Sequence, residues 1–402
     1  MNTNFDIIIV GGGAAGFFTA INIAEKNSKL KIAILERGKE VLTKVRISGG
    51  GRCNVTHACF VPSELVKNYP RGEKELRGPF NTFCSGDTIE WFEKRGVELK
   101  IEDDGRMFPV SNSSQTIIDC FVSETQKYGI QVLTNQSVQS IFKADDFWKV
   151  ETNHENFACE KLILTTGSNS KMWEMLQNMG HSITDAVPSL FTFNIKDKRI
   201  KDLMGLSAVA NVKVKNSKLE ESGPLLITHW GMSGPGILKL SAWGAIELAA
   251  KNYQFAIEIN WLNDLATATV LENLKELKLE HAKKAVSKKS PFDFPNRLWE
   301  SLVLASEIDA ETKWSDLTKN QLQNLANQLT KGEFQVNGKS TFKEEFVTAG
   351  GIDLKEINFK TMESKLHENL FFAGEIVNID AITGGFNFQN AWTSGFILAQ
   401  NF

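Results

Sequence analysis

Three glycines, Gly11, Gly13 and Gly16, have the residue type and spacing of a turn that binds a dinucleotide. They follow an apolar stretch, so Gly11 permits a tight turn and Gly13 lets a pyrophosphate approach the backbone. Gly16 lets the following helix pack closely against the strand, and Ala14 and Ala15 place unpaired N–H groups at the start of that helix. The chemistry predicted here is the binding of a dinucleotide cofactor.

The elements around these glycines support the same interpretation. An alanine-rich helical pattern follows them, and a second apolar strand at 32–35 ends in Glu36. An acid about twenty residues beyond the glycines suits the hydroxyl pair of a ribose. Arg37 either lies along the adenine or is a solvated surface arginine. The sequence therefore predicts a β-α-β unit that holds the adenosine half of a dinucleotide.

Composition limits the class of protein. The chain has 402 residues and a formal net charge of −3, which predicts two or three domains and gives no electrostatic reason to expect nucleic acid or a membrane. It contains no run of eighteen apolar residues. The five cysteines are odd in number and form no Cys-x-x-Cys pair, which indicates reduced thiols. We expect a cytoplasmic protein with a small-molecule substrate and no metal; its oligomeric state cannot be predicted.

The pattern along the chain predicts a discontinuous α/β domain with an insert. We expect helices at 88–94 and 114–128, and strands within 130–142 and 147–165. From 190 the character changes, with a β-rich part at 190–262 and a helical part at 263–335. We therefore expect a domain of residues 1–189 and 340–402, interrupted by an insert of residues 190–339. The lysines of the helical part either lie on a solvated helix face or contact nucleic acid; they are Lys283, Lys284, Lys288 and Lys289.

The last sixty residues return to α/β character. A short apolar strand at 370–373 ends in Gly374 and Glu375, and Gly384 and Gly385 precede a helical run at 390–399. A second strand–glycine–helix unit this far from the first implies that the C-terminal segment folds back onto the N-terminal domain.

Residues 48–56 (Ser-Gly-Gly-Gly-Arg-Cys-Asn-Val-Thr) closely resemble the signature of the BaiN-like NAD(P)/FAD-dependent oxidoreductases, a group that includes aminoacetone-oxidase and bile-acid-reductase types. Four more blocks resemble this family in its order, at 104–109, 228–235, 348–352 and 373–389. The chain departs from the family after Gly167 and at His57, where the family has Asn. The resemblance implies a Rossmann-like, two-dinucleotide-binding-domain flavoprotein with non-covalent FAD and an insert made of a β-barrel-like unit and a helical bundle.

The resemblance also implies where FAD is held. The pyrophosphate would lie over Gly11, Gly13, Ala14, Ala15 and Gly16, the ribose on Glu36, and the adenine along Arg37 and the backbone of Val138. We expect the loop 44–54 to run beside the ribityl chain and the flavin ring, and the turns after two strands to complete the site. The cofactor-binding residues expected in these segments are Lys44, Gly50, Gly51, Arg52, Cys53, Asn54, Thr166, Gly167, Gly374, Glu375, Gly384, Gly385, Phe386 and Asn387.

Two residues are candidates for a catalytic role. Histidine is a common proton donor and acceptor in catalysis, and His229 either passes a proton or only hydrogen-bonds within its Gly/Pro loop. Arg52 either neutralises a phosphate or the reduced flavin. Cys53 is expected to be a small buried thiol rather than a nucleophile.

We therefore expect an FAD-dependent oxidoreductase in which hydride transfer involves transiently bound NAD(P)H or a small organic substrate such as an unsaturated ketone. Two alternatives remain open. One is a flavin oxidase that uses dioxygen and an amino-ketone, and the other is a flavin-dependent RNA-modifying protein or a flavin-bearing binding protein.

Overall fold

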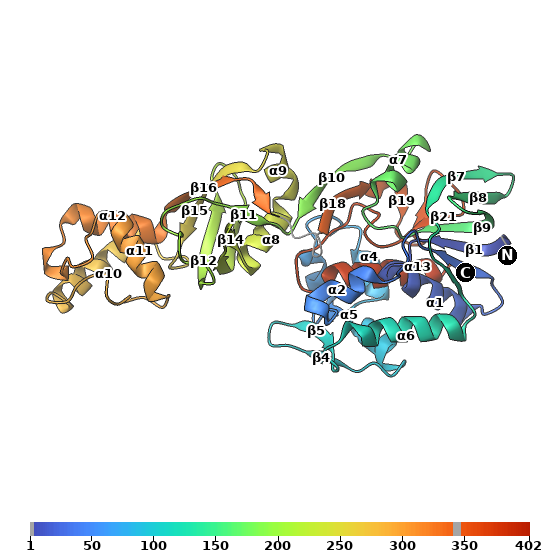
Figure 1. Cartoon of the computed structure of the whole chain (residues 1–402), viewed down its shortest axis with the longest axis horizontal. Helices are drawn as coiled ribbons and strands as arrows, with labels where there is room; N and C mark the ends of the chain where they lie inside the picture. The colour runs from blue at the N-terminus through green and yellow to red at the C-terminus, as the bar shows by residue number, and fades with distance from the viewer. Residues whose placement is uncertain (1–3, 341–346) are drawn as a thin grey trace. The chain divides into compact units, whose positions relative to one another are not determined.

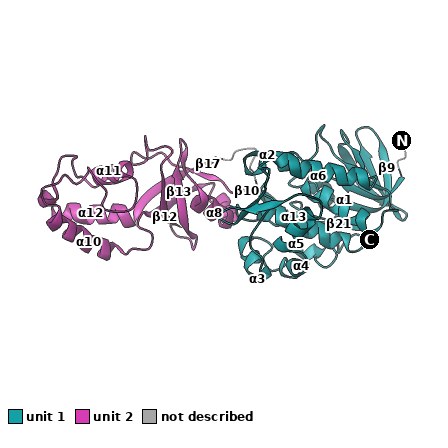
Figure 2. Ribbon diagram, turned by 90° about the horizontal axis from the view of Figure 1, so that it is seen from below, with its two compact units in different colours: residues 1–187, 343–402 teal, residues 188–342 magenta. Residues whose placement is uncertain are grey.

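The computed structural model describes residues 4–340 and 347–402. It divides the chain into two compact units, residues 1–187 with 343–402 and residues 188–342 (Figure 2). The first unit is therefore built from both ends of the chain, and the second from the segment between them.

The first unit is organised around a sheet whose central strands are parallel. Strand β1 (Asn4–Val10) lies between β2 (Ile32–Leu35) and β9 (Asn156–Leu164) and is parallel to both. The parallel order continues with β6 (Gln131–Leu133) beyond β2 and with β21 (Leu370–Phe372) beyond β9. These strands are short and mostly buried, as expected for parallel strands covered on both faces. The C-terminal strand predicted at 370–373 thus joins the N-terminal sheet.

Antiparallel strands complete this sheet at its margins. A hairpin of β7 (Val138–Ala144) and β8 (Phe147–Thr152) pairs with β9. Beyond β21, the short strands β20 (Glu363–Ser364) and β19 (Ile357–Asn358) extend the sheet further.

Two helices from opposite ends of the chain, α1 (Ala14–Lys26) and α13 (Phe386–Ala399), pack side by side against the sheet (Figure 1). Gly395 permits the close approach, because a Cβ there would lie 2.7 Å from the Thr19 Oγ1. Helix α6 (Ser114–Lys127) packs beside α1, and the helical pattern at 114–128 is confirmed.

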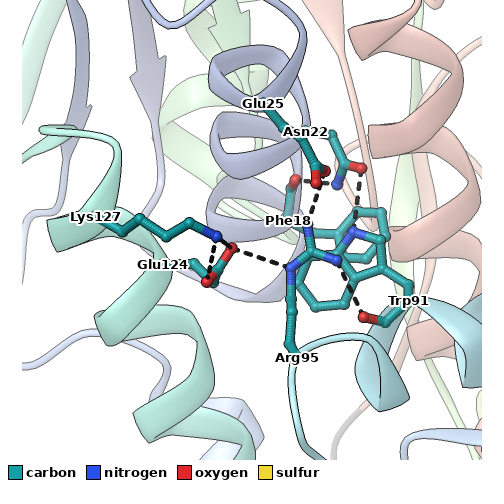
Figure 3. Close-up of polar contacts among 7 residues, drawn as sticks. All are labelled: Phe18, Asn22, Glu25, Trp91, Arg95, Glu124 and Lys127. Atoms are coloured by element: carbon teal, nitrogen blue, oxygen red, sulfur yellow. Dashed lines mark hydrogen bonds and ion pairs between the residues drawn. The ribbon is translucent and has the colours of Figure 1, made fainter.

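Arg95, which is 7% exposed in its side chain, ties α1 and α6 to α5 (Ser85–Glu93) (Figure 3). Its guanidinium pairs with Glu25 at 2.7 Å and with Glu124 at 3.2 Å. It also stacks on the ring of Trp91, at 3.8 Å from the ring centroid, and donates to the Trp91 carbonyl at 3.1 Å. Three helices are thus held together at one buried cation.

The remaining elements of the first unit are short. A small antiparallel sheet has the order β3-β5-β4, and β10 pairs with β18. Their bounds, with those of the connecting helices, are α2 (Thr43–Gly51), β3 (Thr56–His57), α3 (Pro62–Leu65), η1 (Val66–Asn68), α4 (Arg77–Thr82), β4 (Leu99–Ile101), β5 (Arg106–Pro109), α7 (Ser170–Asn178), β10 (Ile183–Ser189), β18 (Val347–Ile352) and η3 (Leu354–Glu356).

The second unit has a seven-stranded antiparallel sheet in the order β16-β15-β12-β13-β14-β11-β17. Strands β16 and β17 are the two ends of this order, so closure into a barrel stays a prediction. The strands are β11 (Thr192–Asn194), β12 (Ser207–Val214), β13 (Glu220–Ile227), β14 (Gly231–Ser233), β15 (Gln254–Asn260), β16 (Gly332–Asn337) and β17 (Lys339–Ser340). The helices are α8 (Pro235–Trp243), α9 (Ala245–Ala250), α10 (Thr267–Glu280), α11 (Asn296–Ala305) and α12 (Lys319–Thr330), with the short turn η2 (Trp314–Asp316).

Two expectations about the insert are corrected. Its β-rich part also contains α8 and α9, because Pro235 begins a helix rather than only interrupting strands. The predicted lysine cluster is not on a helix face: residues 282–290 form turns between α10 and α11, held by a β-bridge between Ala285 and Lys313.

Candidate flavin site

The glycine turn between β1 and α1 has the close contacts that its sequence predicts. Gly11 has φ +115°, and a Cβ on it would lie 2.5 Å from the Thr165 carbonyl oxygen. A Cβ on Gly16 would lie 2.1 Å from the Gly11 carbonyl oxygen, so helix and strand touch there. By contrast, a Cβ on Gly13 would meet nothing within 4 Å among the described residues. The turn is therefore tight on its inner side and open on its outer side, where a phosphate would approach.

Helix α1 presents its first N–H groups without a competing side chain. Its N-cap is Gly13, which carries no side-chain cap, and no acidic residue lies in the first turn. The backbone N–H groups and the positive end of the helix dipole are then directed at whatever anion binds the turn.

Glu36 lies at the end of β2 and is held to the glycine turn. Its Oε2 accepts a hydrogen bond from the Gly12 N–H at 2.9 Å, and its Oε1 accepts one from Gly38 at 2.8 Å. The carboxylate is thus fixed beside the glycine turn by two backbone N–H groups.

A hollow opens beside Glu36, and several predicted residues line it. Among these are Gly11, Glu36, Arg37, Val138 and Thr166. The hydroxyl of Thr166 is buried and has no hydrogen-bond partner in the part of the chain that the structure describes. The sequence analysis missed the other lining residues, which are Val10, Leu35, Gln136, Ser137, Asn169, Lys171, Met172 and Met175.

The C-terminal segment meets this region through Gly374 and Glu375. Gly374 has φ +75°, and its Cβ would lie 2.9 Å from that of Ala15, so the end of β21 contacts the start of α1. Glu375 pairs with Lys44 at 2.7 Å and accepts a hydrogen bond from the Thr348 N–H at 3.1 Å. The Glu375 carboxylate also faces Gly167, whose Cβ would lie 3.7 Å from its Oε2. Residues far apart in sequence therefore converge where the resemblance places FAD.

Gly385 and Asn387 fix the start of α13. Gly385 has φ +94°, and a Cβ on it would lie 2.6 Å from the Thr56 carbonyl oxygen. The Asn387 side chain accepts from the Ala381 N–H at 3.0 Å and donates to the Ala381 carbonyl at 3.2 Å. With its amide oxygen facing Gly385 N at 3.0 Å, Asn54 bonds the same turn from the other side. No acidic residue lies in the first turn of α13, so its N-terminus can also stabilise negative charge.

A buried ion pair holds the loop that precedes α13. Asp380, whose side chain is fully buried, is paired with Arg71 through both carboxylate oxygens. Tyr69 donates its hydroxyl to the Phe386 carbonyl at 2.6 Å. The turn that begins α13 is thus held by buried polar contacts on both sides.

The segment 44–54 differs from the loop that we expected. It lies mostly within α2, and the helix is interrupted where Gly49 and Gly50 have left-handed φ values of +57° and +69°. A Cβ on Gly49 would touch the Phe108 ring at 2.9 Å, whereas one on Gly50 would meet nothing within 4 Å. Gly51, at φ +82°, is as open as Gly50, with its Cβ 4.0 Å from the nearest backbone oxygen.

Arg52 and Cys53 have partners or surroundings that limit their chemistry. Arg52 forms an ion pair with Glu102 at 2.5 Å and lies over the Phe108 ring at 3.9 Å. Burial raises the pKa of the Cys53 thiol to about 12, against a weaker opposing hydrogen bond from Ser48. Cys53 is therefore a thiol at neutral pH, as a structural role would require.

His57, where the chain departs from the family, and His229, the catalytic candidate, lie in different environments. His57 stacks on Phe386 with ring centroids 4.6 Å apart. Burial lowers the pKa of His57, although hydrogen bonding and attraction from Asp104 partly oppose this effect. His229 belongs to the second unit, in the exposed turn between β13 and β14, whereas the segments that we expect to bind FAD all belong to the first.

Fold and site together define an FAD-binding Rossmann-type oxidoreductase carrying an additional antiparallel sheet domain. The chain belongs to the HI0933-like family, because the model described as "HI0933-like protein Rossmann domain" matches residues 5–401. The family resemblance inferred from the glycine-rich signature is thereby confirmed, as is the expectation of an FAD-dependent enzyme.

Three known proteins are similar over nearly the whole chain. A ribosomal RNA dihydrouridine synthase of Escherichia coli is 28% identical over 99% of this chain and 98% of that protein. A 3-dehydro-bile acid delta(4,6)-reductase of Clostridium scindens is 24% identical over 98% of this chain and 97% of that protein. The structure of a 3-ketosteroid-delta4-(5alpha)-dehydrogenase from Rhodococcus jostii has a TM-score of 0.51 at 12% identity, covers 99% of this chain and 97% of that chain, and shows similarity of fold. No helix in the described ranges is long and apolar enough to cross a bilayer.

Proposed function

We propose that this protein is a flavin-dependent reductase that adds hydrogen across the C5=C6 double bond of a uracil base in RNA. The observation that carries the proposal is the full-length similarity to the ribosomal RNA dihydrouridine synthase of E. coli. This follows the RNA-modifying alternative rather than our expectation of a small-molecule substrate without nucleic acid.

The names of the two relatives describe reduction of the same kind of bond, a carbon–carbon double bond conjugated to a carbonyl. The C5=C6 bond of uracil is conjugated to the C4 carbonyl, and the name of the C. scindens enzyme describes a 3-oxo compound with double bonds at positions 4 and 6. In each case the end of the double bond remote from the carbonyl accepts a hydride, and the carbon nearer the carbonyl accepts a proton. The balanced reaction converts uridine, NAD(P)H and a proton to dihydrouridine and NAD(P)+. FAD, when bound without a covalent link, supplies the route for the hydride between the two.

The residues of this chain have roles in binding and charge stabilisation. The turn at Gly11–Gly16 and the N-terminus of α1 would hold the pyrophosphate, and Glu36 would bind the ribose. Lys44, Glu375 and the buried Thr166 hydroxyl would contact the polar middle of the cofactor. The N-terminus of α13, kept free of acidic side chains in its first turn, would stabilise negative charge on the ring.

The test uses FAD-loaded protein, NADPH or NADH under anaerobic conditions, and ribosomal RNA from cells that lack the gene. We expect nucleoside mass spectrometry to detect uridine that has gained two hydrogens, in amounts matching the NAD(P)H consumed. A Glu375→Ala variant should lose FAD and the activity together. NAD(P)H oxidation without any dihydrouridine in the RNA would contradict the proposal.

A second function, reduction of a small conjugated ketone, is supported by the similarity to the C. scindens enzyme. It predicts that a 3-oxo-4-ene steroid reoxidises the NADPH-reduced protein anaerobically. The amino-ketone oxidase alternative predicts instead that an amino-ketone reduces the protein and that air reoxidises it.

A further inference from the structure

We propose that an exposed surface of the second unit binds single-stranded RNA, with Trp230 stacking on a nucleobase and nearby lysines contacting phosphates. This surface, called the Trp230 surface below, consists of Lys196, Lys198, Lys201, Met204, His229 and Trp230. The inference rests on the proposed RNA substrate and specifies where that RNA is held.

Trp230 is unusual among the tryptophans of the chain. Its side chain is 57% exposed, whereas Trp243 is 39% exposed and the other seven of the nine are buried. Its indole is therefore accessible to a ligand in solution. A planar indole with an open face is the side chain on which unpaired bases stack, whatever their sequence.

The backbone beneath Trp230 is held firmly. The turn is closed by a hydrogen bond from the Thr228 N–H to the Gly231 carbonyl at 2.8 Å, and the Trp230 carbonyl accepts one from Ile195 at 2.9 Å. Gly231 has φ +145°, and its Cβ would lie 2.2 Å from the Phe193 carbonyl, so the turn presses against β11. The backbone of the turn is thus ordered before a base binds, so binding does not have to pay the entropy of ordering it.

The segment 195–206 runs alongside this turn and supplies the cations. Its start meets Trp230 through Ile195, and its end meets the same turn through the hydrogen bond from the Gly205 N–H to the Ile227 carbonyl at 2.9 Å. Between these points lie the exposed Lys196, Lys198 and Lys201, and Met204, which is 50% exposed.

The three lysines are available for phosphate contacts. In the described parts of the chain, none of them has a carboxylate within ion-pair distance, whereas the Asp197 carboxylate is bound by Arg199 at 2.7 Å and 2.9 Å. Asp202 is the other acid of the segment, so the segment keeps a net positive charge.

The net charge of the second unit also favours binding of RNA. Residues 188–342 contain 20 Lys and Arg against 17 Asp and Glu, whereas the remaining residues contain 25 against 31. The overall charge of −3 therefore conceals a positive insert, which is the part suited to attract a polyanion.

The experiment measures binding of a fluorescein-labelled, single-stranded oligouridine to the FAD-loaded full chain by fluorescence anisotropy at several salt concentrations. Trp230→Ala should weaken binding by about 5- to 100-fold, the loss of one base–aromatic stack, with the salt dependence unchanged. Trp230→Phe should restore most of the affinity. Trp243→Ala, a matched change at the other partly exposed tryptophan, should leave binding unchanged.

Replacing Lys196, Lys198 and Lys201 together by Ala should reduce the slope of log K against log salt by about 2, because each phosphate contact in a single strand contributes about 0.7. Inorganic polyphosphate has charge but no bases. It should therefore bind more weakly to the triple variant than to the unchanged protein, and equally well to Trp230→Ala. Far-ultraviolet circular dichroism and FAD content should be the same for all variants, which separates lost binding from lost folding.

The outcomes distinguish the surface from the proposed reaction. If Trp230→Ala and the triple variant bind oligouridine as the unchanged protein does, or if the unchanged protein does not bind it, the surface is wrong even if dihydrouridine forms. If RNA binds and depends on Trp230 but no dihydrouridine forms in ribosomal RNA, the proposed reaction is wrong and the surface stands.

Discussion

Gly385→Ala tests whether the close contact beneath the start of α13 determines FAD binding. Gly385 has φ +94°, and the added Cβ would lie 2.6 Å from the Thr56 carbonyl oxygen and 2.9 Å from the side-chain amide of Asn54. The left-handed backbone costs a non-glycine residue about 1–2 kcal/mol. Overpacking against backbone atoms adds about 1–3 kcal/mol, because the nearest atoms cannot rotate away.

We therefore expect Gly385→Ala to lower the free energy of unfolding by about 2–5 kcal/mol. The first turn of α13 must move to relieve the contact, which should also weaken FAD binding by at least about 10-fold, equivalent to about 1.4 kcal/mol. Urea unfolding and FAD titration by flavin fluorescence measure the two effects.

Gly129→Ala is the matched control. Gly129 has a similar left-handed φ of +68°, but its Cβ would meet nothing within 4 Å in the part of the chain that the structure describes. This variant should lose only about 1–2 kcal/mol and keep its FAD affinity. If both variants lose the same stability and bind FAD equally, the argument from the Thr56 contact is refuted.

The remaining predictions concern ionisable and polar side chains of the first unit. Asp380→Asn should destabilise the protein by about 3–5 kcal/mol, because it removes the carboxylate charge that faces Arg71 in a buried site. Glu64→Gln, in the exposed pair with Lys67, should cost less than about 1 kcal/mol. Equal urea midpoints for the two variants would contradict this prediction. Iodoacetamide labelling of the native protein followed by peptide mass spectrometry should modify the half-buried Cys59 and Cys84 before the buried Cys53, and rapid labelling of Cys53 would argue against its raised pKa. Burial lowers the pKa of His181 below its usual 6.5 in the folded state, despite the opposing Glu356 contact, so the unfolded state binds the proton more readily. Its contribution to stability is therefore present above pH 6.5 and is lost as the pH falls below that value. His181→Asn should flatten this part of the stability profile in urea unfolding, and an unchanged profile would show that other groups control it.

The sequence predicted the elements whose signals are local. Each of these signals lies within a few residues: the glycines of the Gly11–Gly16 turn, the acid at Glu36 and the apolar strand before Gly374. The parallel pairing of the first two strands follows from the β-α-β pattern. The start of α13 was placed too late, because Phe386 and Phe388 gave no obvious helical period after the two glycines.

The parts that sequence reasoning missed depend on contacts between distant residues. The lysine-rich segment between α10 and α11 has helical composition, but the Trp299 indole donates to the Val286 carbonyl at 2.7 Å and the backbone N–H of Trp314 donates to the Lys284 carbonyl at 3.0 Å. These bonds hold the segment in turns. Met172 and Met175 line the hollow beside Glu36 because α7 lies next to it, although Asn169, which caps α7, gave a local signal for that helix.

The position of β21 has a consequence for how the protein is made. Because β21 pairs with β9 and α13 packs on α1, the first unit cannot close until α13 has left the ribosome. The insert has its own hydrophobic core and can fold earlier, while the apolar face of α1 waits for α13. At the proposed site, FAD would therefore bind only after α13 has been made, and a chain that stalls within this helix would remain an apoprotein.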